Sequence, residues 1–206
     1  MQVVRRKKET GNTIVEFALV SVFLIPLLLG TVNVGMNMSR SIQVTQISRD
    51  AGHMFVRSVD FSEPGNQDIL VRLAQGLNMT RTGGNGKIVL TRVMMIGEPQ
   101  CTAAGLTLGD CTNYTQPVIT QQLVIGNPNL RPSDFGEAPA ELLDSKGEMS
   151  MDDYITDVRA RATGFGGVLA LQPGELAYVA ETYFESPEFD FPGFFENTNV
   201  YARTIF

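Results

Sequence analysis

The stretch from Phe17 to Ser39 contains no charged residue, and it constrains the fold of this chain more than any other feature. Its core at residues 17–32, FALVSVFLIPLLLGTV, is almost entirely apolar. A helix of ~20 apolar residues is long enough to cross the hydrocarbon core of a bilayer. Four basic residues at positions 5–8 precede it, and such a basic flank is retained in the cytoplasm. The sequence therefore predicts a single-pass membrane protein with a cytoplasmic N-terminus.

Charge is distributed unevenly along the 206 residues. The formal net charge is −6, but residues 1–11 carry +3, so the rest of the chain carries −9. Nucleic-acid-binding proteins normally present a basic face, so we expect no nucleic-acid partner. One His and two Cys are too few for a zinc site of the usual ~four ligands. We expect no metal, no cofactor, no catalytic residue and no enzymatic activity.

Three interpretations of the N-terminus compete. A secretory signal peptide requires small residues after its apolar region, and NVGMNM at residues 33–38 is a poor match. An uncleaved signal anchor fits the length and the charge. Neither interpretation explains Glu16, because a carboxylate beside an apolar segment is costly and marks a function. The third interpretation places a cleavage site before the apolar segment.

Residues 5–11 read RRKKETG, and residues 12–17 read NTIVEF. A basic run, Gly11, four residues, then Glu16 and Phe17 resemble the class III signal of type IV pilin-like proteins. Within that group, residues 5 to about 60 resemble the TadE-like family of tight-adherence (Tad) pilus pseudopilins. The resemblance implies that a prepilin peptidase cuts after Gly11, so that the mature chain begins at Asn12 and Glu16 is its fifth residue.

Cleavage at this position has a clear physical consequence. It creates an ammonium group at Asn12, and Glu16 lies one helical turn further along the same helix face. Within lipid, a carboxylate is stabilised by an ammonium of the same chain or of a neighbouring subunit. This geometry predicts a role for Glu16 in assembly, and the resemblance implies that Glu16 and Phe17 act in processing and assembly.

The resemblance also implies a function, partners and a location. It implies a structural or assembly subunit of a bacterial Tad type IV pilus or secretion system. The implied partners are the inner membrane, the prepilin peptidase, other pilin-like subunits and the Tad assembly machinery. The head would be periplasmic, or part of a surface pilus after assembly. The alternative is an uncleaved, signal-anchored periplasmic binding or adhesion domain.

The predicted fold is α+β, with three segments. Residues 1–11 are the cleaved leader, residues 12–38 the transmembrane and assembly helix, and residues 39–206 an extracytoplasmic head. One long helix is expected from about Thr13 to Val59, with its first half in the membrane and its second half packed on a small antiparallel sheet. Pro26 has no backbone N–H, so we expect it to bend this helix.

Hydrophobic periodicity predicts the remaining elements of the head. Helices are expected at residues 67–77 and 150–163, and an irregular segment rich in Pro, Gly and Asp at residues 126–147. Predicted strands cover residues 87–96, 117–125, 176–184 and 199–206.

Cys101 and Cys111 lie ten residues apart in a predicted loop. Outside the cytoplasm such a pair can be oxidised, so we predict a disulfide rather than free thiols or a metal site.

Other candidate residues have plainer interpretations. We expect His53 to have a surface or packing role, and the acidic residues Asp152, Asp153 and Asp157 to be solvated, since they lack the spacing of a calcium loop. Residues 164–167, GFGG, lack the Lys-Ser/Thr of a phosphate loop and predict a turn. An aromatic cluster is either a partner surface or a cover for the edge of the sheet; it comprises Phe189, Phe191, Phe194 and Phe195.

Overall fold

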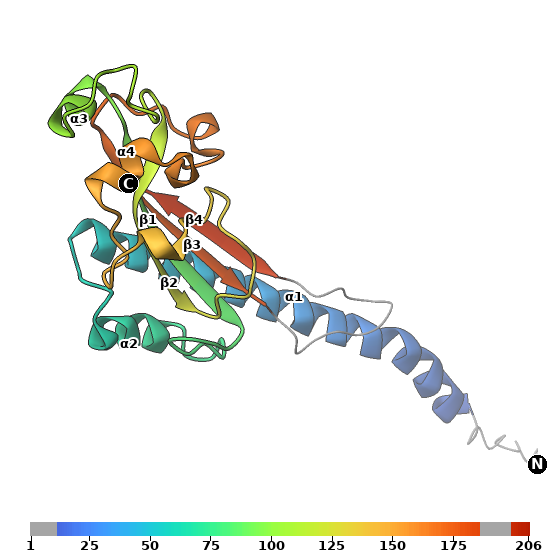
Figure 1. Ribbon diagram of the computed structural model, residues 1–206. Helices are drawn as coiled ribbons and strands as arrows, with labels where there is room; N and C mark the ends of the chain where they lie inside the picture. Colours follow the sequence, from blue (N-terminus) through green and yellow to red (C-terminus); the bar gives the residue numbers. More distant parts are fainter. Residues whose placement is uncertain (1–11, 186–198) are drawn as a thin grey trace, which may run out of the picture. The chain divides into compact units, whose positions relative to one another are not determined.

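The computed structural model describes residues 12–185 and 199–206 (Figure 1). The chain divides into two units, of which the first ends at Ser39 and the second begins at Arg40. One helix, α1 (Asn12–Val56), contributes residues to both units. The second unit contains the sheet, so the fold is α+β, as predicted.

Helix α1 ends three residues earlier than expected because of Ser58. This residue has a φ of 61°, in the left-handed region that stops a helix. Its N–H donates to the carbonyl of Phe55 over 2.9 Å, and the N–H of Val59 donates to the carbonyl of Met54 over 3.1 Å. These two bonds form a Schellman motif, which usually has Gly at the left-handed position. A serine there gave no sequence signal for the end of the helix.

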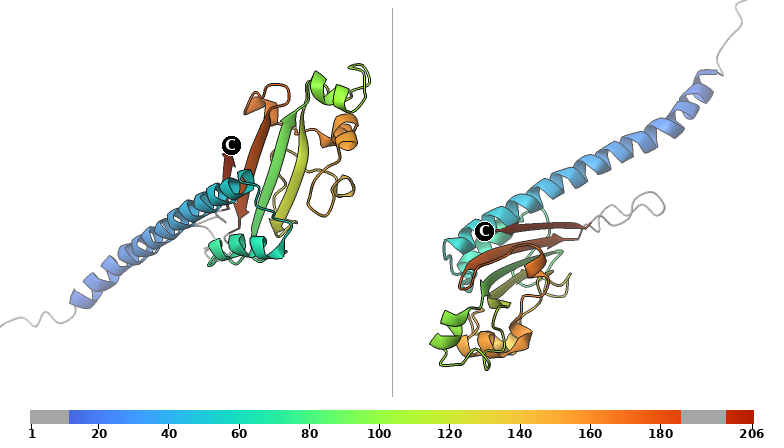
Figure 2. Two further views of the ribbon diagram at one scale, coloured as in Figure 1. Left: turned by 90° about the vertical axis from the view of Figure 1, so that its left-hand side faces the viewer. Right: turned by 90° about the horizontal axis from the view of Figure 1, so that it is seen from above.

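Four antiparallel strands form one sheet in the order β2-β1-β3-β4 (Figure 2). Their bounds differ from the prediction by at most one residue at either end: β1 (Gly86–Met95), β2 (Pro117–Gly126), β3 (Leu176–Phe184) and β4 (Val200–Ile205). Strand β1 is central and pairs with both β2 and β3. The predicted antiparallel sheet is therefore confirmed.

One face of this sheet packs against the part of α1 that belongs to the second unit. Buried apolar residues of α1 recur at three- and four-residue steps, which places them on one side of the helix. Helix α2 (Pro64–Leu73) adds a buried leucine to the same core. This core includes Val44, Ile47, Ala51, Phe55, Leu70, Ile88, Leu90, Ala180 and Phe184.

Helix and sheet approach closely at Ser48 and Gly52. The hydroxyl of Ser48 donates to the carbonyl of Ala180 over 3.0 Å and lies 3.1 Å from the hydroxyl of Thr204. A Cβ atom at Gly52 would lie 2.4 Å from the ring of Phe206 and 3.3 Å from the Cβ of Ala180. Small side chains on α1 therefore set the distance between the helix and strands β3 and β4.

The opposite face of the sheet is covered by the irregular segment and by short helices. We call residues 128–138 the strap. Its polar backbone groups bond to side chains of the sheet: Gln122 Nε2 donates to the carbonyl of Gly136 over 3.0 Å, and Gln122 Oε1 accepts from the N–H of Ala138 over 2.8 Å. Lys87 Nζ lies 3.1 Å from a carboxylate oxygen of Glu137. The strap has no regular secondary structure to satisfy its backbone groups. Buried polar side chains of the strands supply those hydrogen bonds instead.

Two helix predictions in the head were wrong in extent. Helix α4 (Met151–Thr156) begins after Ser150, whose hydroxyl accepts from the N–H of Asp153 over 3.2 Å. It stops seven residues before the predicted end because Asp157 has an extended backbone. Helix α2 begins three residues earlier than predicted, with Pro64 as its first residue, and ends at Leu73 rather than residue 77.

The predicted cysteine loop contains a short helix, α3 (Glu98–Ala103). The segment at residues 164–167 forms a turn as expected, with Gly164 in the left-handed region and a 3-10 turn at Phe165–Gly167.

Candidate membrane and assembly helix

The first half of α1 exposes a continuous apolar surface. Four of its side chains, Ile14, Phe17, Phe23 and Leu27, are each at least 70% exposed. Within the described residues, α1 is the one helix that is long and apolar enough to cross a membrane, and its most apolar window is not buried. A core helix of a soluble domain would bury such residues. The segment therefore fits a membrane location.

Polar groups within this apolar stretch bond to the helix itself. The hydroxyl of Ser21 donates to the carbonyl of Phe17, and that of Thr31 donates to the carbonyl of Leu28, each over 2.8 Å. In hydrocarbon, where water is absent, such internal bonds satisfy groups that would otherwise be unpaired. Pro26 lies inside α1, whose helical residues continue on both sides. The bend expected there stays a prediction.

The residues of the predicted processing site lie at the start of α1. Asn12 is the first residue of the helix, and Glu16 follows four positions later, on the same face. The side chains of Glu16 and Phe17 are both exposed. Gly11 and the leader lie outside the described residues, so cleavage between Gly11 and Asn12 stays a prediction.

The two cysteines are brought together in the head. The Sγ atoms of Cys101 and Cys111 lie 1.98 Å apart, which is disulfide distance, as predicted. Both cysteines are buried in a small core with Ile96, Val118 and Ile155. The pair closes a loop that begins within α3.

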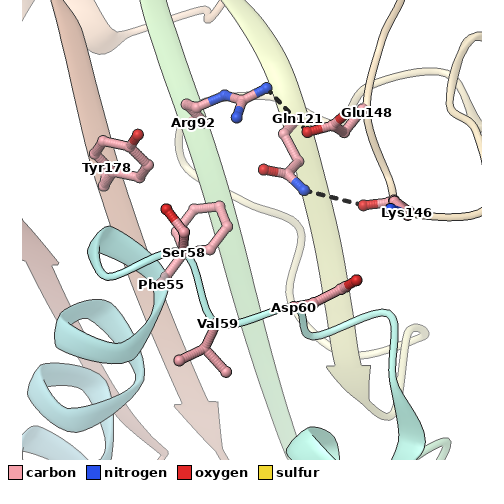
Figure 3. Close-up of a pocket in the computed structure, with 9 residues that line it drawn as sticks. All are labelled: Phe55, Ser58, Val59, Asp60, Arg92, Gln121, Lys146, Glu148 and Tyr178. Atoms are coloured by element: carbon pink, nitrogen blue, oxygen red, sulfur yellow. Dashed lines mark hydrogen bonds and ion pairs between the residues drawn. The ribbon is translucent and has the colours of Figure 1, made fainter.

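A polar pocket of about 260 Å³ lies beyond the end of α1 (Figure 3). Arg92 extends from β1 across it, and its Nη2 atom lies 3.4 Å from a carboxylate oxygen of Glu148. Gln121 Nε2 donates to the carbonyl of Lys146 over 3.0 Å. The pocket carries two cations and two anions, since Asp60 also lines it. Its formal charges sum to zero, and we assign no ligand to it.

The remaining candidates of the sequence each have their own local contacts. His53 packs against Phe206, with ring centroids 4.6 Å apart. Asp153 bonds to the hydroxyl of Ser150, and Asp157 pairs with Arg159, whose side-chain hydrogen bond lowers the pKa of that carboxyl. Within the described residues, no three His, Cys, Asp or Glu side chains are placed to hold a metal ion. The phenylalanine cluster at residues 189–195 lies outside the described residues.

Sequence reasoning missed a polar cluster on the strap side of the sheet. Glu181 is buried in β3 and accepts hydrogen bonds from the hydroxyls of Ser133 and Tyr201 and from the N–H of Asp134. The signal available in the sequence was that Glu181 interrupts an otherwise apolar or neutral strand, LAYVAETYF. A charged residue at a buried strand position requires partners, but the sequence does not identify them.

One comparison with known proteins yields a match. The family model described as TadE-like protein matches residues 11–53. No curated protein and no solved structure matches the chain. The matched segment begins at Gly11 and includes nearly all of α1. Over residues 11–53, the chain therefore matches the TadE-like family that its N-terminal motif predicted.

Proposed function

We propose that this chain is a pilin-like structural or assembly subunit of a bacterial Tad type IV pilus or secretion system, and that it has no catalytic activity. One observation carries the proposal: the match to the TadE-like family starts at Gly11 and extends over an exposed apolar helix. The family match supports a pilus-associated, pseudopilin-like role. Its partners would be the inner membrane, the prepilin peptidase, other pilin-like subunits and the Tad assembly machinery.

The geometry of α1 gives this role a mechanism. Cleavage after Gly11 would remove the basic leader and leave the new ammonium one helical turn from Glu16. The apolar helix would hold the subunit in the inner membrane with the head in the periplasm. Assembly would then transfer this apolar surface from lipid to neighbouring helices, which are equally apolar. The Glu16 carboxylate would fix the axial position of each subunit, because an unpaired charge at that depth is costly.

The N-terminal residue of the membrane-derived protein tests the cleavage step. In cells with an active prepilin peptidase we expect Asn12, and mass spectrometry should show the loss of residues 1–11. Gly11→Leu should leave the leader in place, because a bulky side chain blocks close approach to the scissile carbonyl. Gly35→Leu, in the same helix but away from the cleavage site, should be processed normally. Met1 on the wild-type protein would instead favour the uncleaved, signal-anchored binding or adhesion domain.

A second experiment addresses assembly separately from cleavage. Glu16→Ala should still insert into the membrane but should not co-purify with other pilin-like subunits after detergent extraction. Glu63→Ala, which removes an exposed carboxylate in the head, serves as the control and should co-purify as the wild type does. Normal recovery of partners by Glu16→Ala would contradict the proposed role of this carboxylate.

A further inference from the structure

Strands β2 and β4 form the two edges of the sheet (Figure 2), and these edges differ in how their backbone groups are satisfied. The outer edge of β2 is covered by the head itself. The N–H of Gln122 donates to the carbonyl of Gly147 over 2.8 Å, and the N–H of Met149 donates to the carbonyl of Thr120 over 2.9 Å. Within residues 12–185 and 199–206, no backbone segment bonds to the outer edge of β4.

The register of β4 identifies the groups on its outer edge. Tyr178 and Phe206 exchange both backbone hydrogen bonds, over 3.0 and 2.9 Å. In an antiparallel ladder, such doubly bonded pairs alternate with pairs whose backbone groups point away from each other. The residues between the bonded ones, Tyr201, Arg203 and Ile205, therefore direct their N–H and C=O groups outward. An added strand would form its backbone hydrogen bonds with these three N–H donors and three C=O acceptors.

The central residue of this edge carries a charge. Arg203 is exposed, and its guanidinium carbon lies 5.1 Å from the centroid of the Phe135 ring. Among the described residues, no carboxylate forms an ion pair with it. A strand added to this edge would place one residue directly opposite Arg203 on the same face of the sheet. Oppositely charged cross-strand pairs are favourable, and like charges are unfavourable.

We propose that the outer edge of β4 binds an extended segment of another protein, and that this segment places a carboxylate opposite Arg203. Backbone hydrogen bonds would give the affinity, and the carboxylate would give the selectivity. The proposal does not depend on cleavage at Gly11 or on assembly into a pilus, so its failure can be told apart from failure of the proposed function.

A second copy of this chain is a poorer partner for the same edge. An antiparallel pair of β4 strands that uses all three outward residues places Arg203 opposite Arg203. A register that separates the two arginines pairs only two outward residues, Tyr201 and Arg203 or Arg203 and Ile205. Self-association therefore loses either charge complementarity or part of the ladder.

Residue-resolved amide exchange on the full chain in detergent micelles tests the open edge directly. In the free protein, the amides of Tyr201, Arg203 and Ile205 should exchange about tenfold or more faster than those of Ala202 and Thr204, which bond to β3. The two sets alternate along one strand, so each serves as a control for the other. Equal protection of both sets would mean that the edge is already covered, and would overturn the proposal.

The probe for the partner is the synthetic peptide acetyl-Thr-Val-Glu-Val-Thr-amide at millimolar concentration. It should slow exchange of the three outward amides. The same peptide with Lys in place of Glu should bind about fivefold more weakly, the change expected for a difference of about 1 kcal/mol. A version methylated on the Glu nitrogen lacks the central donor and should give no protection.

Charge reversal on the protein completes the test. Arg203→Glu should invert the preference between the two peptides, whereas Arg203→Lys should preserve it. Protection of Ala202 and Thr204 in each variant reports that the strand is still folded. Equal binding of both peptides by the wild type would overturn the charge assignment. Protection that rises with protein concentration alone would show that a second copy is the occupant, and would also overturn the proposal.

Discussion

At the scale of single residues, two buried threonines of the sheet differ in whether their hydroxyls are bonded. Thr182 of β3 is fully buried, and its hydroxyl has no hydrogen-bond partner among the described residues. Thr91 of β1 is equally buried, but its hydroxyl accepts from Gln122 Nε2 over 3.2 Å. A buried polar group without a partner costs ~1–3 kcal/mol.

The two threonines form a matched pair for mutagenesis. Thr182→Val should raise the free energy of unfolding by about 1 kcal/mol, because it removes an unsatisfied group at nearly constant volume. Thr91→Val should lower it by about 1–2 kcal/mol, because Gln122 loses an acceptor. Urea unfolding of the full chain in micelles measures both changes. Destabilisation by Thr182→Val would show that its hydroxyl is bonded after all.

Tyr201 makes the stability of the head sensitive to alkaline pH. Burial, and then the hydrogen bond that its hydroxyl donates to Glu181, raise the pKa of Tyr201 above its ordinary value of 10.0. The folded protein therefore holds this proton more tightly than the unfolded chain. The resulting stabilisation is fully present below pH ~10 and is lost as the pH rises towards the folded-state pKa.

The measurement is the urea midpoint at pH 8 and pH 11 for the wild type and for Tyr201→Phe. The midpoint should fall between these pH values in the wild type and should fall less in the variant. Some dependence will remain, because burial also raises the pKa values of Tyr154 and Tyr183. An identical fall in both proteins would exclude Tyr201 as the source.

At the scale of elements, the contact of α1 with the sheet depends on a glycine. Gly52→Leu should lower the stability of the head by about 2 kcal/mol or more, because its side chain would occupy the positions of Phe206 and Ala180. Gly35→Leu lies in the same helix, where an added Cβ has nothing within 4 Å, and should leave the unfolding midpoint of the head unchanged. Equal midpoints for both variants would mean that Phe206 moves aside without cost.

The sequence predicted the regular elements well and the irregular ones poorly, for physical reasons that differ by element. The apolar run of α1 and the alternating strands have periodicities that burial imposes, so their existence and order were predictable. The end of α4 depended on the backbone conformation of Asp157, which composition does not specify. Lys87, Gln122 and Glu181 each bond to a strap residue that lies 14 to 50 residues away, and only the folded structure brings them together.

At the scale of the whole molecule, the apolar half of α1 is suited to lipid, whereas the head is suited to water. Leu24 and Leu28 are each 56% exposed in the apolar half of α1. Leu24→Arg combined with Leu28→Arg should release the protein from membranes in a carbonate wash, since each arginine costs ~2.5–3.5 kcal/mol at the centre of a spanning helix.

The matched control places the same charges on the same helix within the head. Thr45→Arg combined with Gln46→Arg changes two exposed polar positions of α1 and should leave membrane association intact. Refolded under oxidising conditions, the variant with two arginines in the apolar half should still form the Cys101–Cys111 pair, because the cysteines belong to the second unit. Retention of that variant in the membrane pellet would contradict a spanning role for this segment.

The hydrogen bond between Ser48 and Thr204 joins residues 156 positions apart, and this has a consequence for how the chain is made. As the ribosome produces it, α1 emerges early, but strands β3 and β4, which cover its apolar stripe, are synthesised last. Such distant contacts raise the contact order and slow folding. The part of the stripe from Val44 to Phe55 that packs on these two strands therefore stays uncovered until nearly the whole chain exists. Removing the last six residues would take away most of β4 and would uncover strand β3 and the side of α1 that carries Ser48 and Gly52.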